Sequence, residues 1–368
     1  MSQSCAFVGC SLLVIVVACG STDSAGSGNS AAGAANTVSG AAGASSSNGG
    51  GANATGGAGA AAANGGAPVS GGATANGGAL PNGGATANGG TTSAGQGGGA
   101  GTGTGGGSVC PGARPDATNT GVPSGVTPTV VDQDVTITVD NTTFDSMDVH
   151  GFLIVKANNV KITRSIVRGG VATHNGDGIQ IASGTGTLIE DSEVALAHPS
   201  AYLDGIGGSD VTVRRCNVHG GVDGMKVGSN SIVECNYIHD MSSFDVDPNQ
   251  NGGPTHNDAI QILSGTKIRI TGNQLIAAKD QNSAIQVTQD FGVVADLVVA
   301  SNWADGGGCS FNFSHKGQPS LAVTANDNRF GRNSFFNCPI LHSIETTLTA
   351  AGNVWDDDGT PVPIQMHD

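Results

Sequence analysis

The sequence has few aromatic residues, few charged residues and a deficit of basic side chains. Of its 368 residues, 4% are aromatic and 12% are charged, whereas an average soluble domain has roughly 25% charged residues. This composition, with 61 glycines, excludes a helical bundle. Lysine and arginine number 14 against 29 acidic residues, so the surplus of positive charge that neutralises phosphates is missing. We therefore expect no nucleic-acid partner.

Long apolar segments are also missing. Residues 5–18 form an uncharged run of 14 residues, which is too short to span a bilayer but fits the apolar region of a signal peptide. The run ends in VVAC at residues 16–19, which resembles a bacterial lipobox, where the cysteine becomes the lipidated first residue of the mature protein. We expect a signal peptide over residues 1–19, a lipid anchor at Cys19 in the outer membrane and a domain at the cell surface. Plain secretion is the alternative.

A low-complexity segment follows. Residues 20–108 consist almost entirely of Gly, Ala, Ser, Asn and Thr, with a single charge at Asp23. Such a segment cannot bury enough apolar surface to offset the entropy of ordering. We expect a disordered linker that ends at a folded domain over residues 109–368.

The folded domain is predicted from a repeat of about 25 residues. Each unit reads V-x-I-x-x-N/S-x-V, then a Gly-rich loop, then D-G-I-Q-I, and the helical periodicity of a β/α barrel is missing. A repeat made of strands alone must stack on its neighbours to bury its apolar face. The sequence therefore predicts an all-β fold, a right-handed parallel β-helix of about nine coils, and we expect a monomer. Predicted core residues of two coils are Val160, Ile162, Val167, Ile268, Ile270 and Leu275.

One turn of each predicted coil carries a small side chain, mostly polar, that can hydrogen-bond along the stack. These positions are Thr142, Ser165, Ser192, Cys216, Asn236, Asn273, Asn302, Asn328 and Asn353. Their recurrence predicts a structural ladder.

The eight cysteines are too few for a disulfide-dense scaffold, and none has the spacing of a zinc site. Cys309 and Cys338 take the same position in adjacent coils, which predicts a disulfide. Cys216 and Cys235 lie one residue out of register in adjacent coils, and we expect a second bridge there. Cys110 has no evident partner.

The D-G-I-Q-I strand is predicted to display columns of side chains on its outer face. Ile179 and Ile181 are expected to point inward, so the residues around them face outward. One expected outer column is small, from Gly151 through Gly178 to Pro339. The next column reads Leu153, Gln180, Gly207, Lys226, Gln261, Gln286, Asn312 and Leu341, and its amides can bind hydroxyls and carboxylates. At the edge of the strand, consecutive coils carry Asp177, Asp204, Asp223 and Asp258.

The four aspartates are predicted to lie about 5 Å apart by strand spacing, where like charges repel unless a cation or a base compensates them. Carboxylate oxygens suit Ca²⁺, although an aspartate before glycine also shapes turns. The loops entering these strands carry five of the nine histidines, among them His219 and His256. The longest predicted coil inserts residues 240–257, and such a long loop over a groove is typical of a binding loop.

With these columns, residues 130–364 resemble the pectate-lyase-like superfamily of right-handed β-helix, carbohydrate-active enzymes. The resemblance implies a polysaccharide, expected to be acidic, along the outer face of the strand column. It implies Lys226 as the base that removes the proton α to a uronate carboxyl, with His219 and His256 in reserve. Ca²⁺ would be held by Asp177, Asp204, Asp223 and Asp258, and substrate would contact Gln180, Gln261, Gln286 and Asn312.

Three functions stay open at this point. We expect first a Ca²⁺-assisted polysaccharide lyase, or an epimerase that uses the same proton abstraction. A glycoside hydrolase that uses a pair of the four aspartates is the second. A non-catalytic glycan-binding or adhesion module is the third. The low aromatic content, with two Trp and two Tyr, favours either this module or a charged substrate.

Overall fold

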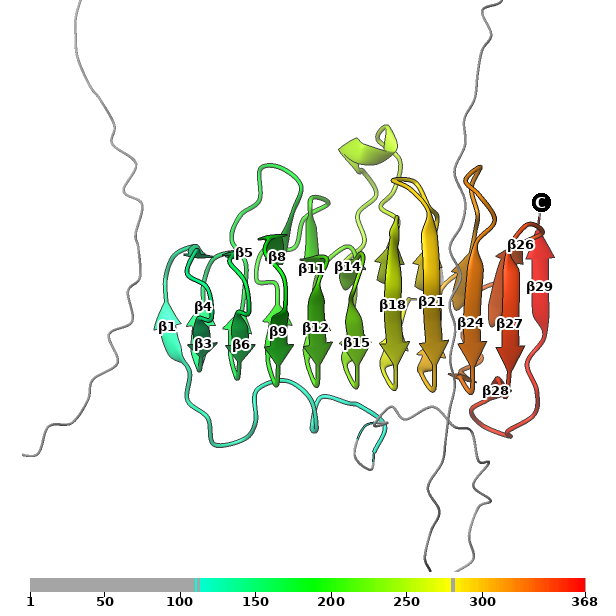
Figure 1. The fold of residues 1–368 in the computed structure, drawn as a ribbon, viewed down its shortest axis with the longest axis horizontal. Coiled ribbons are helices and arrows are strands. Elements are labelled where there is room, and N and C mark those ends of the chain that lie inside the picture. Colours follow the sequence, from blue (N-terminus) through cyan, green and yellow to red (C-terminus); the bar gives the residue numbers. More distant parts are fainter. Residues whose placement is uncertain (1–109, 111–112, 279–281, 368) are drawn as a thin grey trace, which may run out of the picture. The chain divides into compact units, whose positions relative to one another are not determined.

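The computed structural model describes residue 110, residues 113–278 and residues 282–367. The predicted signal peptide, Cys19 and the linker lie outside these ranges. Within them the fold is a right-handed parallel β-helix, in which three parallel sheets run along the stack and consecutive coils lie side by side (Figure 1). The predicted fold class is confirmed. The described residues contain no helix long and apolar enough to cross a membrane, and their one helical turn is η1, Pro248–Gln250.

Each coil contributes one strand to each sheet, in the order B, C, A along the chain after the first strand. Sheet A has ten strands: β1 (Thr129–Val131), β4 (Met147–Val149), β7 (Ile166–Val167), β10 (Glu193–Ala195), β13 (Asn217–His219), β16 (Tyr237–His239), β19 (Gln274–Ile276), β22 (Trp303–Asp305), β25 (Arg329–Phe330) and β28 (Val354–Trp355). Sheet B has ten: β2 (Val135–Ile137), β5 (Leu153–Lys156), β8 (Gly176–Ser183), β11 (Leu203–Gly208), β14 (Met225–Val227), β17 (Asp258–Ile262), β20 (Ser283–Val287), β23 (Phe311–Phe313), β26 (Ile340–Ser343) and β29 (Ile364–His367). Sheet C has nine: β3 (Thr143–Asp145), β6 (Lys161–Thr163), β9 (Thr187–Glu190), β12 (Val211–Arg214), β15 (Ile232–Glu234), β18 (Gly265–Thr271), β21 (Val294–Ala300), β24 (Ala322–Asn326) and β27 (Thr347–Ala351).

The core is a column of aliphatic side chains between the three sheets. All six predicted core residues are fully buried: Val160, Ile162, Val167, Ile268, Ile270 and Leu275. Toward the C-terminal coils, Phe311, Phe313 and Phe330 fill the interior with tilted and edge-on ring contacts. Because neighbouring coils share this core, burial fixes the register of each new coil on the last.

The polar ladder at the turn from sheet C to sheet A is confirmed. In the asparagine part, the backbone N–H and the side-chain amide of Asn273 both donate to Oδ1 of Asn302, at 3.0 Å each, and the pattern repeats at the next coils. Ser165 and Ser192 continue it with hydroxyls. The prediction that Thr142 belongs to the ladder is wrong. In the first coil the ladder position is Met147, whose backbone N–H donates to Oγ of Ser165. Thr142 lies at the earlier turn, from sheet B to sheet C.

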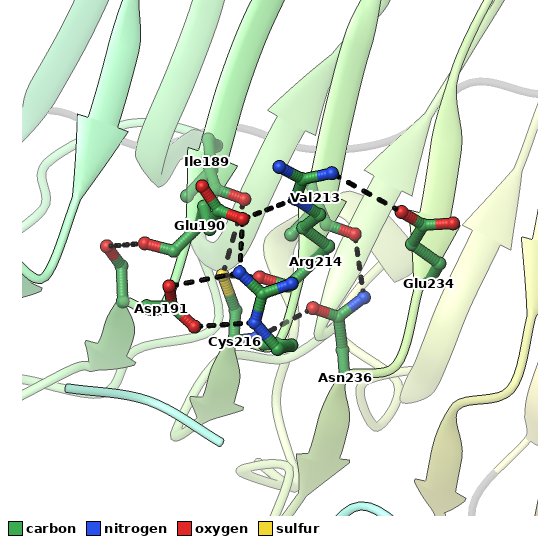
Figure 2. Close-up of polar contacts among 10 residues, drawn as sticks. Ile189, Glu190, Asp191, Val213, Arg214, Cys216, Glu234 and Asn236 are labelled. Atoms are coloured by element: carbon green, nitrogen blue, oxygen red, sulfur yellow. Dashed lines mark hydrogen bonds and ion pairs between the residues drawn. The ribbon is translucent and has the colours of Figure 1, made fainter. Parts of the chain in front are cut away.

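Beside this ladder, ion pairs join the coils on the outside (Figure 2). Arg214 lies between Glu190, at 2.5 Å, and Glu234, at 3.9 Å, while Arg215 pairs with Asp191 at 2.7 Å and also with Glu190. These side chains are partly exposed, so each pair adds modest stability. The charges of Glu190, Arg214 and Glu234 alternate in sign from coil to coil, which favours the observed register.

The structure confirms one predicted disulfide and overturns the other. Cys309 and Cys338 are bonded between adjacent coils. Cys235 bonds to Cys110, with a Cα–Cα distance of 5.3 Å, and Cys216 is a buried free thiol. The predicted Cys216–Cys235 bridge fails because the two residues occupy different positions of the turn. Cys216 is the ladder residue and its sulfur faces the carbonyls of Ile189 and Arg214, whereas Cys235 precedes the ladder residue in a left-handed conformation.

Candidate active site

The strands of sheet B contain a local irregularity that decides which side chains meet outside. A Cβ added to Gly178 would lie 3.1 Å from Cγ1 of Val194, and one added to Gly205 would lie 2.8 Å from Cγ1 of Val218, so both glycines face the interior. Ala259 and Ala284, at the equivalent positions, are fully buried. The predicted outer column of small residues is therefore wrong. Two consecutive residues of each strand face inward, and the aspartate before them and the residue after them share the outer face.

The predicted amide column is present on that face. Gln180, Gly207, Lys226, Gln261, Gln286 and Asn312 are neighbours in consecutive strands of sheet B. Leu153, which was predicted to begin the column, is the wrong residue by one position. Ile154 pairs with Gln180, whereas Leu153 is fully buried beside Ile179. Gln180 lines a cavity of about 430 Å³ that Asp177 also lines, and Gln261 lines the central cavity described below. Gln286 is almost fully buried and accepts a hydrogen bond from Ser283, so it is not displayed to a ligand.

The aspartate column is linked by the backbone. The N–H of Asp223 donates to Oδ1 of Asp204 at 3.0 Å, and the N–H of Asp258 donates to Oδ1 of Asp223 at 2.7 Å. Asp177 pairs with Asp204 across the strands β8 and β11. The two hydrogen bonds hold the carboxylates of Asp204 and Asp223 over the coil that follows each of them. Asp177 keeps some exposure, whereas Asp204, Asp223 and Asp258 are buried.

Lys226 lies in the middle of this column. Its Nζ is 2.7 Å from Oδ2 of Asp204 and 3.0 Å from Oδ2 of Asp223, and about a third of its side chain is exposed (36%). Burial lowers the pKa of Lys226, but the charges of Asp223 and Asp204 raise it by more, so its pKa lies above the usual value. The amine is therefore held as an ammonium ion, which does not suit it to the predicted role of base.

Two aspartates titrate near neutrality. Burial, followed by the charge of Asp204, raises the pKa of Asp177 to about 7, although Lys226 opposes the rise. Burial and Asp204 also raise the pKa of Asp223 to about 7, and burial raises that of Asp258 well above its usual range. Asp177 lies over Gly207, where an added Cβ would come 2.3 Å from its Oδ1. Gly207 thus makes room for a carboxyl that is protonated for part of the time at pH 7.

The predicted Ca²⁺ site does not fit the donor set. Both oxygens of Asp204 and both of Asp223 already accept hydrogen bonds from Lys226 or from the next backbone N–H. Oδ1 of Asp258 is buried without a hydrogen-bond partner among the described residues, but a single such oxygen is far from the six to eight ligands that Ca²⁺ takes. Across the described part of the chain, no group of three or more His, Cys, Asp or Glu side chains is placed to hold a metal ion. The ammonium of Lys226, rather than a metal ion, balances the charges of Asp204 and Asp223.

Loops from the sheet A edge close over this column. A cavity of about 330 Å³, which we call the central cavity, is lined by Asp204, Asp223, Lys226, Gln261, Tyr202, His256 and residues of the two loops around Asn175 and Asn249. The side-chain amides of Asn175 and Asn249 hydrogen-bond each other reciprocally at 3.1 and 3.0 Å. The predicted binding loop over residues 240–257, which carries η1, therefore walls the cavity together with the loop before β8; both rise from the same edge of the stack (Figure 1).

Of the two histidines proposed as reserve bases, the structure brings one to the site. His256 lines the central cavity. His219 belongs to β13 in sheet A, where its Nε2 lies 3.0 Å from Glu193 and its ring stacks on His239 with centroids 5.1 Å apart. His219 is thus engaged on a different sheet from Lys226, and the two cannot act on one bond.

Sequence reasoning missed Phe291 and the Asn175–Asn249 pair. Phe291 is 81% exposed and lines both the central cavity and a second cavity of about 270 Å³ that contains Asp177, Gly207, Lys226 and Gln261. No repeat position marks Phe291, because it lies in a turn between sheets B and C. In the sequence, Phe291 could be noticed only as an apolar residue in a loop that directly follows a strand of the site.

Comparison with known proteins adds no relative. No family model, no curated protein and no solved structure matches the chain. The function must therefore be argued from the geometry of the outer face of sheet B alone.

Proposed function

We propose that the protein cleaves a polysaccharide at the outer face of sheet B, as a glycoside hydrolase that uses Asp177 and Asp204. One observation carries this proposal: two neighbouring carboxyl groups have different electrostatic surroundings. Among the described residues Asp177 makes no ion pair, and burial raises its pKa to about 7, whereas Asp204 lies 2.7 Å from the ammonium of Lys226. Glycosidases need such a pair, one protonated and one ionised, on either side of the scissile bond.

The roles follow from the charges. The protonated Asp177 donates its proton to the glycosidic oxygen as the bond from that oxygen to the anomeric carbon breaks. Asp204 then takes a proton from the attacking water, or attacks the anomeric carbon itself, and the net reaction adds one water across the bond. Lys226 holds Asp204 in an ion pair and so acts as a positioning residue, while Gln180 and Gln261 offer amides to sugar hydroxyls.

β-Elimination, which the resemblance to pectate-lyase-like enzymes implies, is the second candidate. The observation that favours it is that His256 lines the central cavity, which Lys226 also lines. In this alternative, His256 removes the proton α to a uronate carboxyl, Lys226 balances the charge that develops, and Asp177 protonates the leaving oxygen. The acidic polysaccharide expected from the sequence belongs to this alternative.

The location of the enzyme is proposed from the N-terminal segment. We infer that the domain is exported and held at the outer membrane through a lipid on Cys19, where it would meet extracellular polysaccharide. Labelling cells with radioactive palmitate tests this, since the label should enter the wild-type chain and be lost in Cys19→Ala.

The experiment for the catalytic proposal is a product assay on a panel of neutral and acidic polysaccharides. A hydrolase releases reducing ends without ultraviolet absorbance from unsaturated uronate, and it works in EDTA. Asp177→Asn and Asp204→Asn should each lose at least about a hundredfold in kcat, the usual contribution of one acid–base group, while Asp191→Asn, outside the site, retains activity. Unsaturated products would favour elimination instead. Binding of a glycan without any product would leave a non-catalytic module and overturn both reactions.

A further inference from the structure

An exposed phenyl ring lies at the open side of the central cavity. Phe291 is 81% exposed, and it lines this cavity together with Lys226 and Gln261. It also lines the second cavity, which contains Asp177. The same ring thus lines one cavity with Asp204 and the other with Asp177, the two proposed catalytic groups.

The turn that carries Phe291 is held rigidly. Gln289 is fully buried, although it is polar and has a left-handed backbone. Its side-chain amide donates to the carbonyl of His315 at 2.8 Å, and its Oε1 accepts the N–H of Val294 at 2.8 Å. The N–H of Phe291 donates to the carbonyl of Leu263 at 3.0 Å. The ring is therefore exposed on a fixed backbone, which reduces the entropy lost when a ligand stacks on it.

The charges around the ring favour a ligand without a carboxylate. The central cavity is lined by Asp204, Asp223 and Asp247, and Lys226 is the one lysine or arginine among its lining residues. The ammonium of Lys226 already lies within 3.0 Å of two carboxylates. An anionic sugar would therefore meet no uncompensated positive charge from a lysine or arginine, whereas the hydroxyls of a neutral sugar can bind to carboxylates and amides.

We propose that Phe291 is a stacking platform that binds one ring of a neutral pyranose chain beside Asp177 and Lys226. The apolar face of the sugar covers the phenyl ring, and its hydroxyls reach Gln261 and the carboxylates. The substrate class rests on the proposed hydrolase, but the binding role of Phe291 does not require catalysis.

The test measures binding apart from turnover. Calorimetric titrations would use the Asp177→Asn protein with neutral β-linked gluco-, manno- and xylo-oligosaccharides, and with oligogalacturonate as the acidic counterpart. A neutral oligosaccharide should bind, and adding Phe291→Ala should weaken it about three- to tenfold, the range expected for one aromatic contact. Phe291→Trp should restore the affinity. The matched control is Phe336→Ala, whose ring is 67% exposed and lines neither cavity.

The outcomes separate this proposal from the proposed function. Since Phe291 is exposed, its alanine variant should keep the wild-type melting temperature, so a loss of binding is not a loss of folding. Equal affinity with and without the ring, binding of oligogalacturonate alone, or no binding by any oligosaccharide of the panel would overturn the platform. If the ring-dependent binding appears but the wild-type protein releases no product, the hydrolase fails and the platform stands.

Discussion

Replacing Asp177 by asparagine should stabilise the protein at alkaline pH while it removes activity. The native carboxyl has a pKa of about 7 against an ordinary value of 3.8, because burial and Asp204 disfavour its charged form. The folded chain therefore holds this proton more tightly than the unfolded chain. Its contribution to stability is fully present below about pH 4 and is lost as the pH rises through 7. Asparagine has the same shape and no charge to bury.

The size of the effect follows from the two pKa values. Their difference is worth about 4 kcal/mol at a pH well above 7, since one pKa unit corresponds to about 1.36 kcal/mol. Partial exposure of Asp177 makes this a ceiling, so we expect Asp177→Asn to gain between about 2 and 4 kcal/mol relative to wild type on going from pH 4 to pH 8. Urea unfolding of both proteins across that range measures it.

Asp145→Asn is the control of opposite sign. A hydrogen bond from Arg164 is the main reason that the pKa of Asp145 is lowered to about 2, so this group stabilises the fold above pH 4 and loses that effect as the pH falls through 2. Its asparagine variant should therefore be less stable than wild type at neutral pH. If the difference between wild type and Asp177→Asn stayed constant from pH 4 to pH 8, the electrostatic account of the site would be refuted.

Three further predictions concern the residues that hold the stack and the site together. Lys226→Met leaves Asp204 and Asp223 without their counter-charge and should lower the free energy of unfolding by about 1–3 kcal/mol at pH 8. The loss should be smaller at pH 5, where the carboxyls take up protons. A loss that does not depend on pH in urea unfolding would contradict this. Asn302→Ala removes the ladder acceptor of Asn273 and should cost about 2–4 kcal/mol in the same measurement, and a neutral effect would show that the ladder is dispensable. Replacing both Cys110 and Cys235 by serine opens a cross-link between residues 125 positions apart and should lower the unfolding free energy by about 2–4 kcal/mol. The control Cys216→Ser removes a free thiol and keeps both disulfides, so reductant should lower its stability as much as that of the wild type.

The fold could be predicted because its pattern repeats. The spacing of Asn273, Asn302 and Asn328 fixes one turn of each coil, and aliphatic residues at fixed offsets from it fix the core. Errors appeared where the local backbone departs from simple alternation. In sheet B, Gly178 and Ile179 both face inward, so strict alternation placed Gly178 on the wrong side.

The site was predictable in its aspartate and amide columns but not in its electrostatics. Stacking alone brings Lys226 to Asp204 and Asp223, as the sequence indicated. The sequence could not show that the amine and the backbone N–H groups donate to the carboxylate oxygens of Asp204 and Asp223, which makes these oxygens poor ligands for Ca²⁺. The sequence also could not show that His219 ends a strand of sheet A. A histidine next to a loop can belong to the loop or to the strand before it, and the residue type does not distinguish the two.

The most direct test of the central claim is the titration of Asp177 itself. Carbon-13 spectra of the side-chain carboxyl, recorded on aspartate-labelled protein from acid to alkaline pH and assigned by the signal lost in Asp177→Asn, give its pKa. The structure predicts a value near 7 beside an Asp204–Lys226 ion pair. A midpoint close to the ordinary 3.8 of a solvated aspartate would contradict it and would leave the proposed hydrolase without its proton donor.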